Sequence, residues 1–197
     1  LRAKGKEAQA EMVRNIIPAG VECIFVRQAE QLGLGHAVLC AERAVGGDAF
    51  TVLLADDFLT DYEPGVTGDL VQAFAASGKS QLSVMEVDGL DISKYGVVVP
   101  SVSGAGIAGL VEKPTASEAP SNLASIGRYV LTPDFFDTLR GLRAGSGGEI
   151  QLADAINIHA QSGSVEMVRL NGQRFDCGSV AGFMAASTHE FASRGFC

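Results

Sequence analysis

The candidates for chemistry in this chain are carboxylates that close apolar, β-like runs. Asp56 and Asp57 end the run AFTVLLADD at residues 49–57, and Asp176 closes a later run. A carboxylate beside buried chain is stabilised where it faces a cleft or binds a cation, and oxygen ligands of this kind suit Mg²⁺. Asp also favours turns and helix N-caps, so a purely structural role is an equal alternative for each of the three.

An anion and a cation stand side by side at Glu112 and Lys113, where a further β-like run ends before Pro114. Alternation along a strand points two such side chains to opposite faces. A carboxylate accepts hydrogen bonds from sugar hydroxyls and an ammonium group neutralises phosphate, so the pair suits a sugar phosphate. The plainer alternative is a solvated pair of surface charges.

A glycine-rich turn, Gly33-Leu34-Gly35, leads from an apolar run into a helical stretch. Glycines there often only form the turn, and Val38 stands where the GxGxxG motif of dinucleotide-binding folds requires glycine. The turn is therefore a weak sign of nucleotide binding, and no GxSxG elbow indicates a hydrolase. We expect His36 in the first helical turn near a ligand, and His159 and His189 at the surface.

Helices and strands alternate around these residues. The patterns predict helices over residues 3–16, 36–45, 67–78, 132–142, 148–163 and 179–193. They predict strands over residues 21–28, 49–57, 80–87 and 164–170, short β-like runs within 95–131, and a hairpin return over 172–178. The unbroken apolar body of residues 49–57 predicts a strand buried on both faces, which forms a βαβ unit with residues 21–28. Residues 1–197 are thus expected to form one α/β domain.

Composition excludes several classes of protein. With 47% apolar and 19% charged residues in 197, the chain is typical of a compact globular domain. A net charge of −8 argues against broad binding to nucleic acid. The four cysteines form no CxxC pair and indicate neither a zinc site nor a disulfide framework, which favours the cytoplasm. No apolar run approaches the roughly 20 residues that span a bilayer, so we expect no membrane partner.

Seven motifs in order resemble bacterial UTP–glucose-1-phosphate uridylyltransferases, the family that makes UDP-glucose and pyrophosphate from UTP and glucose 1-phosphate. They are VRQ…GLGHAVLCA (26–41), LLADD (53–57), KYGVVV (94–99), GLVEKP (109–114), APSNLASIGRYVL (119–131), GEIQLADAI (148–156) and FDCGSVAGFMAA (175–186). The resemblance implies a Rossmann-like nucleotidyltransferase fold, with three α/β/α layers and a mixed central sheet. It also implies a Mg²⁺ cofactor and UTP, glucose 1-phosphate and UDP-glucose as partners.

The resemblance assigns the nucleotide and metal contacts by position. Gln28 and Gly33 match residues that recognise the uracil ring. Asp56 and Asp176 match the carboxylates that hold Mg²⁺ and so take part in catalysis. Asp57 is expected to support them from behind.

The sugar-phosphate contacts follow in the same way. Gly96, Glu112 and Lys113 match the sugar-phosphate site, with Glu112 on the glucose hydroxyls and Lys113 on the phosphate. Lys113 thereby joins the catalytic set. Tyr129 matches a position that lines the sugar pocket.

One family motif has no counterpart. The glycine-rich loop near the family's amino terminus, roughly GxGTRxxPxTKxxPKEM, is unmatched in residues 1–25. We therefore expect a chain truncated at the amino terminus, with little uridylyltransferase activity alone. A missing strand leaves an exposed sheet edge, so a homo-oligomer is expected. Two alternatives are a related sugar-1-phosphate nucleotidyltransferase that uses another nucleoside triphosphate and a non-catalytic sugar-nucleotide-binding module.

Overall fold

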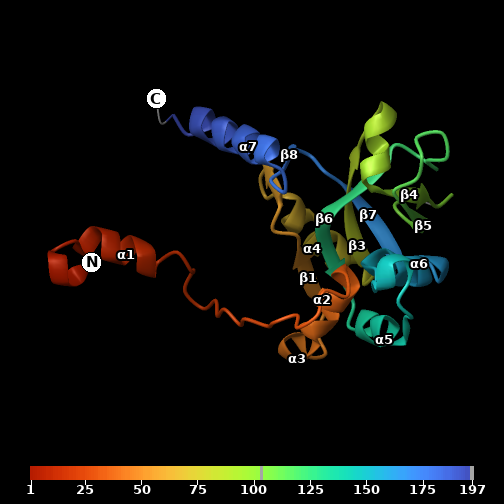
Figure 1. The fold of residues 1–197 in the computed structure, drawn as a ribbon, viewed down its shortest axis with the longest axis horizontal. Coiled ribbons are helices and arrows are strands. Elements are labelled where there is room, and N and C mark those ends of the chain that lie inside the picture. The colour runs from red at the N-terminus through yellow and green to blue at the C-terminus, as the bar shows by residue number, and fades with distance from the viewer. Residues whose placement is uncertain (103, 196–197) are drawn as a thin grey trace.

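The computed structural model describes residues 1–102 and 104–195, and its centre is a mixed six-stranded sheet (Figure 1). The strands are β1 (Phe50–Leu53), β3 (Ser80–Glu86), β4 (Gly96–Pro100), β5 (Ile107–Glu112), β6 (Leu123–Leu131) and β7 (Val165–Arg169). They are ordered β5-β4-β6-β3-β7, with β1 also paired to β6. Strand β7 runs parallel to β3, whereas β6 runs antiparallel to β1, β3 and β4. The predicted α/β class with a mixed sheet is confirmed.

Helices pack on both faces of this sheet. They are α2 (Leu34–Cys40), α3 (Glu42–Val45), α4 (Val66–Ser77), α5 (Asp134–Gly141) and α6 (Leu152–Gln161). Helix α4 contacts β3, β6 and β7, whereas α6 contacts β5 and β7 and packs on α2 and α5. Along β6, Tyr129 and Leu131 belong to the apolar core shared with α5 and α6, and alternation turns the buried Val130 to the other face. The layers are therefore helix, sheet and helix.

The segment before this core differs from the prediction. The structure has a short 3-10 helix, η1 (Arg2–Lys4), and α1 (Glu7–Arg14) near the predicted helix, but no strand over residues 21–28. Phe25 in this segment is 93% exposed, and the segment extends away from the sheet (Figure 1). A β-like composition forms a strand only where a neighbouring strand pairs with its backbone groups, and no described strand does so here. The predicted βαβ unit is therefore wrong.

Strand β1 also differs from the prediction. It is shorter than residues 49–57, and its side chains alternate between half-buried and exposed, with Leu53 53% exposed. Among the described strands it pairs with β6 alone, so it lies at an edge and is not buried on both faces. The predictions for residues 67–78 and 80–87 agree with α4 and β3. Helix α4, for example, ends at Gly78, whose φ of 69° is the left-handed conformation typical of a glycine after a helix.

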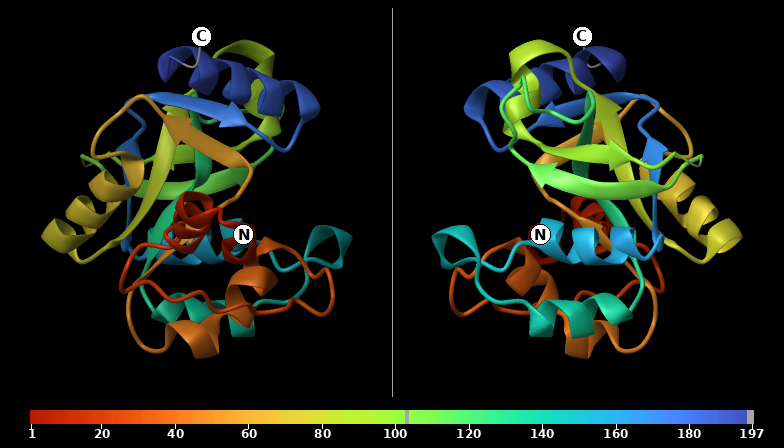
Figure 2. Two further views of the ribbon diagram at one scale, coloured as in Figure 1. Left: turned by 90° about the vertical axis from the view of Figure 1, so that its left-hand side faces the viewer. Right: turned by 90° about the vertical axis from the view of Figure 1, so that its right-hand side faces the viewer.

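A second, two-stranded sheet stands beside the first. Strands β2 (Asp57–Thr60) and β8 (Gln173–Asp176) pair antiparallel, with Asp57 opposite Asp176. The predicted hairpin return of residues 172–178 onto the preceding strand is wrong, because the chain turns away at Gly172, whose φ of 140° favours glycine. Helix α7 (Val180–Ser193) follows and lies beside β8 at the opposite end of the molecule from α5 (Figure 2).

Two further 3-10 helices complete the described chain, η2 (Gly89–Lys94) and η3 (Ser146–Gly148). Within the described ranges, no helix has the length and apolar character needed to cross a membrane.

Candidate functional site

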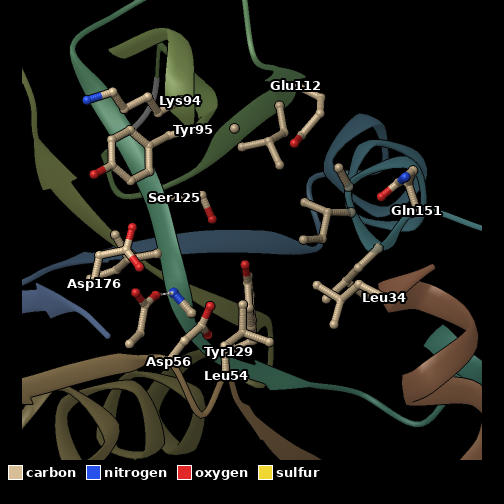
Figure 3. A pocket seen from close by; sticks show the side chains of 18 of the residues that line it. Leu34, Leu54, Asp56, Lys94, Tyr95, Glu112, Ser125, Tyr129, Gln151 and Asp176 are labelled. Carbon is tan, nitrogen blue, oxygen red and sulfur yellow. Dashed lines mark hydrogen bonds between the residues drawn. The ribbon is translucent and has the colours of Figure 1, made fainter. Parts of the chain in front are cut away.

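A pocket of about 250 Å³ opens where the small sheet β2–β8 meets β4, β5 and β6 of the main sheet (Figure 3). Six residues singled out from the sequence line it, namely Asp56, Asp57, Gly96, Glu112, Tyr129 and Asp176. Asp56 and Asp176 lie on one side of this space and Glu112 and Gln151 on the other (Figure 3). The fold thus brings Asp56 and Asp176 together with Gly96, Glu112 and Tyr129.

Asp56 and Asp176 converge on one point beside Gly178. Asp56 lies in the turn between β1 and β2, and its main-chain oxygen accepts a hydrogen bond from Cys177 N at 2.7 Å. A Cβ atom placed on Gly178 would lie 3.1 Å from Asp176 Oδ1 and 3.2 Å from Asp56 Oδ2. Glycine therefore leaves open a space that two hard oxygen donors share.

The oxygens of Asp56 and Asp176 fit a divalent cation that takes only some of its ligands from the protein. The described residues include no group of three or more His, Cys, Asp or Glu placed to hold a metal ion. Mg²⁺ is commonly held by one or two carboxylates, with water and substrate phosphates completing its shell. The structural alternative is present too, since Asp176 Oδ1 accepts a hydrogen bond from Gly178 N at 3.1 Å in a turn.

Asp57 is buried behind this pair. Its side chain is 5% exposed, its Oδ2 accepts a hydrogen bond from Gly127 N at 2.6 Å, and its Oδ1 pairs with Arg174 Nη2. Burial lowers the pKa of the Arg174 guanidinium, but the hydrogen bond and charge of Asp57 outweigh burial, so the pKa is raised overall. Arg174 is therefore a fixed cation beside the two open carboxylates.

A bulge in β6 presents Gly127 to Asp57. The pairing of β3 with β6 shifts register at Leu82 and Ser83, and the Ser83 hydroxyl contacts the carbonyls of Ile126 at 3.1 Å and Arg128 at 2.9 Å. A Cβ atom on Gly127 would lie only 2.6 Å from Asp57 Oδ2. Bulges beside active sites commonly aim a backbone or side-chain group in this way.

The opposite wall is built on the pairing of Gly96 with Glu112 in β4 and β5. A Cβ atom on Gly96 would lie 3.0 Å from Glu112 Oε2, so the carboxylate lies over the glycine. The side chains of Glu112, Ser125 and Tyr129 point toward the same space (Figure 3). Burial raises the pKa of the Tyr129 phenol, an effect that Ser125 partly offsets, which keeps the hydroxyl protonated at neutral pH.

Lys113 does not line the pocket. Its φ is 46°, its side chain is 66% exposed, and its Nζ lies 3.9 Å from Glu112 Oε1. The cations that do line the pocket are Lys94 and Arg174. Lys94 Nζ lies 2.7 Å from Asp91 Oδ1, and the hydrogen bond to Asp91 raises the pKa of Lys94.

Gln28 and Gly33 lie next to the pocket and outside its lining. Gln28 Nε2 donates to Gly33 O at 3.0 Å and lies 2.9 Å from His36 Nδ1. The turn packs on the backbone of Ile150, since Gly35 N donates to Ile150 O at 2.9 Å and a Cβ atom on Gly33 would lie 2.8 Å from the same oxygen. Leu34, between the two glycines, does line the pocket.

The expectation that His159 lies at the surface is wrong. His159 is 7% exposed, stacks on Phe135 with ring centroids 3.9 Å apart, and has its Nε2 2.9 Å from Thr138 Oγ1. Burial lowers the pKa of His159. The sequence could have predicted this burial, because His159 shares one helical face with the other buried residues of α6. These are Leu152, Ala155, Ile156 and Ala160. His189 is half-buried, with its Nε2 2.7 Å from Asp61 Oδ2.

Several pocket residues had no assigned role in the sequence. They are Lys94, Tyr95, Ser125, Gln151 and Arg174. Lys94 and Tyr95 belong to the KYGVVV motif and Gln151 belongs to GEIQLADAI. The motifs therefore identified these segments but assigned no role to these side chains. Arg174 stands two residues before Asp176, where strand alternation places both side chains on one face.

Comparison with known proteins gives consistent matches. The family model described as nucleotidyl transferase matches residues 3–192. The UTP–glucose-1-phosphate uridylyltransferase of Pseudomonas aeruginosa is 38% identical over 193 residues, which cover 95% of this chain and 68% of that protein. The one of Haemophilus influenzae is 38% identical over 196 residues, covering 94% of this chain and 66% of its own length.

Solved structures agree with these matches. A UDP-glucose pyrophosphorylase complexed with UDP-glucose superposes with a TM-score of 0.84 at 37% identity, covering 96% of this chain and 73% of that chain. A UTP-bound enzyme of the same kind from Acinetobacter baumannii gives 0.85 at 37% identity, covering 96% of this chain and 67% of that chain. The chain thus spans about two thirds of the length of its curated relatives.

Proposed function

The chain belongs to the nucleotidyl transferase family, in its UTP–glucose-1-phosphate uridylyltransferase branch, and from this premise we propose that its pocket transfers a uridylyl group from UTP to glucose 1-phosphate. The single observation that carries the proposal is the convergence of Asp56 and Asp176 in the pocket that also holds Gly96 and Glu112. The products are UDP-glucose and pyrophosphate.

Members of this family generally use a divalent metal, and we propose Mg²⁺ here, held by Asp56 and Asp176. The ion supplies charge neutralisation on the phosphates when bound. The two carboxylates suit this role because both are oxygen donors facing one open space.

The chain's own residues position the substrates. Phosphoryl transfer depends mainly on positioning and charge stabilisation, because the attacking phosphate is already ionised. Glu112 accepts hydrogen bonds from the glucose hydroxyls, and Gly96 leaves room for the ring. Tyr129 lines the sugar site and presents a protonated hydroxyl to it.

Three further positions complete the proposed site from outside the pocket lining. Gln28 and Gly33 form the contact to the uracil ring, at the turn that meets the pocket through Leu34. Lys113 holds the phosphate of glucose 1-phosphate, which its flexible side chain reaches by rotating from its exposed position beside Glu112.

Activity also requires the glycine-rich triphosphate-binding element that residues 1–25 do not match. We expect the polypeptide of residues 1–197 by itself to bind UDP-glucose and to turn over far more slowly than the order of 10 s⁻¹ typical of enzymes.

We further propose that residues 1–197 belong to a single nucleotidyltransferase domain, that the protein is cytoplasmic, and that it forms a homo-oligomer. Exposed apolar side chains on α7, such as Phe183 and Met184, support self-association.

Calorimetric titration of UDP-glucose with and without Mg²⁺ tests the proposed site. The variants Asp56→Ala and Asp176→Ala are expected to lose the Mg²⁺ dependence of binding, and Glu112→Ala is expected to weaken binding at every Mg²⁺ concentration. Asp48→Asn, which changes an exposed acid outside the pocket, is the matched control. Unchanged affinity and unchanged Mg²⁺ dependence in both Asp variants would contradict the proposal.

A further inference from the structure

A buried ion pair adjoins the two metal carboxylates. The side chains of Asp57 and Arg174 are 5% and 12% exposed. Asp57 lies directly opposite Asp176 in the pairing of β2 with β8, and opposed residues of an antiparallel pair project to the same face. A third carboxylate therefore stands next to the space that Asp56 and Asp176 share, and all three line one pocket.

Asp57 differs from the other two carboxylates because both of its oxygens are engaged. Oδ2 accepts a hydrogen bond from Gly127 N at 2.6 Å, and Oδ1 pairs with Arg174. Its main-chain oxygen also accepts a hydrogen bond from Arg128 Nη2 at 2.7 Å. Asp57 is thus fixed at its backbone and at both oxygens of its carboxylate.

Arg174 is fixed in turn by Tyr95, the residue before β4. Its Nη1 donates to Tyr95 Oη at 3.1 Å, and its guanidinium carbon lies 5.2 Å from the centre of the Tyr95 ring. Hydrogen bonding and cation–π contact together orient the planar guanidinium. Arg174 is therefore held between Tyr95 and Asp57 where it lines the pocket.

We propose that Asp57 and Arg174 form a positioning pair that keeps Asp57 from ligating the divalent cation and limits the uncompensated charge of the site to that of Asp56 and Asp176. The inference rests on the proposed function, since it assigns these residues a role toward the same cation. Arg174 cancels the charge of Asp57, so the cation meets two free carboxylates instead of three.

The opposite charges of Asp57 and Arg174 predict opposite changes in the affinity for a divalent cation when each residue is replaced singly. Arg174→Met leaves Asp57 uncompensated and its Oδ1 free, so the site binds a divalent cation more tightly by about tenfold or more. Asp57→Asn leaves Arg174 uncompensated beside the cation, so binding weakens by about tenfold or more. The double variant Asp57→Asn/Arg174→Met restores the charge balance and brings affinity back to within about threefold of the unaltered protein, because only the small residual difference in polarity remains.

The experiment measures Mn²⁺ binding to the protein by electron paramagnetic resonance, with and without UDP-glucose, for these three variants. Arg174→Lys keeps the charge and is expected to change affinity less than Arg174→Met. Arg169→Met removes an exposed arginine on β7 and is the matched control. Thermal unfolding of each variant, followed by circular dichroism, identifies any that are unfolded.

The sign pattern separates positioning from a merely structural role. If the pair only stabilises the fold, all the variants weaken Mn²⁺ binding and the double variant binds no better than the weaker single variant; that result overturns the inference. Asp56→Asn and Asp176→Asn test the proposed function in the same assay. Mn²⁺ affinity that survives both changes overturns the metal site and the inference with it, whereas loss of affinity in both, with the wrong sign pattern, overturns the inference alone.

Discussion

Replacement of Gly127 by alanine is expected to damage both the fold and the proposed metal site. A Cβ atom at this position would lie 2.6 Å from Asp57 Oδ2 and 2.6 Å from Leu54 Cβ. Neither neighbour can move freely, because Asp57 is paired with Arg174 and Leu54 N donates to Gly127 O at 2.9 Å. The substitution therefore pushes apart the bulge of β6 and the turn that carries Asp56.

The magnitude follows from two losses. The buried hydrogen bond from Gly127 N to the Asp57 carboxylate involves a charged acceptor, and such bonds contribute about 1.5–3 kcal/mol. Forcing an extra methyl group into an occupied space costs about 1–3 kcal/mol. The free energy of unfolding of Gly127→Ala is therefore expected to fall by about 2.5–6 kcal/mol. For a chain of this size, Tm falls by about 10 °C.

Urea unfolding followed by circular dichroism measures this change. Gly141→Ala is the matched control, because a Cβ atom there meets no atom within 4 Å and the residue ends α5. Alanine at an open helical position stabilises by up to about 1 kcal/mol. A Gly127→Ala variant within 1 kcal/mol of the unaltered protein would refute the assignment of Gly127 as the support of Asp57.

Three further changes test other parts of the structure. Stability is expected to fall as the pH drops through 6.5 and below, because burial lowers the pKa of His159 below its ordinary value of 6.5, so the unfolded chain binds more protons; urea midpoints against pH measure this. Asn157→Leu is expected to destabilise by about 1–3 kcal/mol, because Leu110 N loses Asn157 Oδ1 at 2.5 Å and Leu110 O loses Asn157 Nδ2 at 2.9 Å. Gly96→Ala is expected to weaken UDP-glucose binding by about tenfold, the effect of losing about 1.4 kcal/mol, because it displaces Glu112; calorimetry measures this.

Each of these has a control and an opposing result. His159→Gln is expected to flatten the pH dependence near 6.5, and an unchanged slope would assign the effect to another group. Asn171→Leu alters an exposed asparagine, and an equal loss in both Asn variants would show that the contact with Leu110 is unimportant. Gly47→Ala, at an open position, is expected to leave UDP-glucose affinity unchanged. Equal affinity for Gly96→Ala would contradict the placement of Glu112.

The sequence predicted elements whose stability is local or whose pattern reflects burial. Helix α4 with its terminal Gly78 and strand β3 follow from spacing and turn residues alone. Residues 21–28 have the composition of a strand but form none, since pairing depends on a partner that local composition does not contain. The pairing of β8 with β2 was missed for the same reason, because it depends on where the chain travels after Gly172.

The carboxylates of the candidate site could be predicted because their residue type alone suggests a function. Asp56, Asp176 and Glu112 stood out because carboxylates at the ends of apolar runs are costly without a role. Arg174 and Tyr95 did not, since their roles depend on Arg174 contacting both Tyr95 and Asp57, which lie far from it in the sequence. Lys113 matches its motif, yet its side chain lies outside the pocket lining in this conformation.

The most direct test of the proposed site is a crystal structure of the protein with UDP-glucose and Mn²⁺, with the metal located by its anomalous scattering. We predict one peak bonded to both Asp56 and Asp176 at about 2.0–2.2 Å, the range for a small divalent cation on oxygen ligands, with the glucose hydroxyls against Glu112. A metal peak away from these carboxylates, or UDP-glucose bound outside this pocket, would contradict the proposed function.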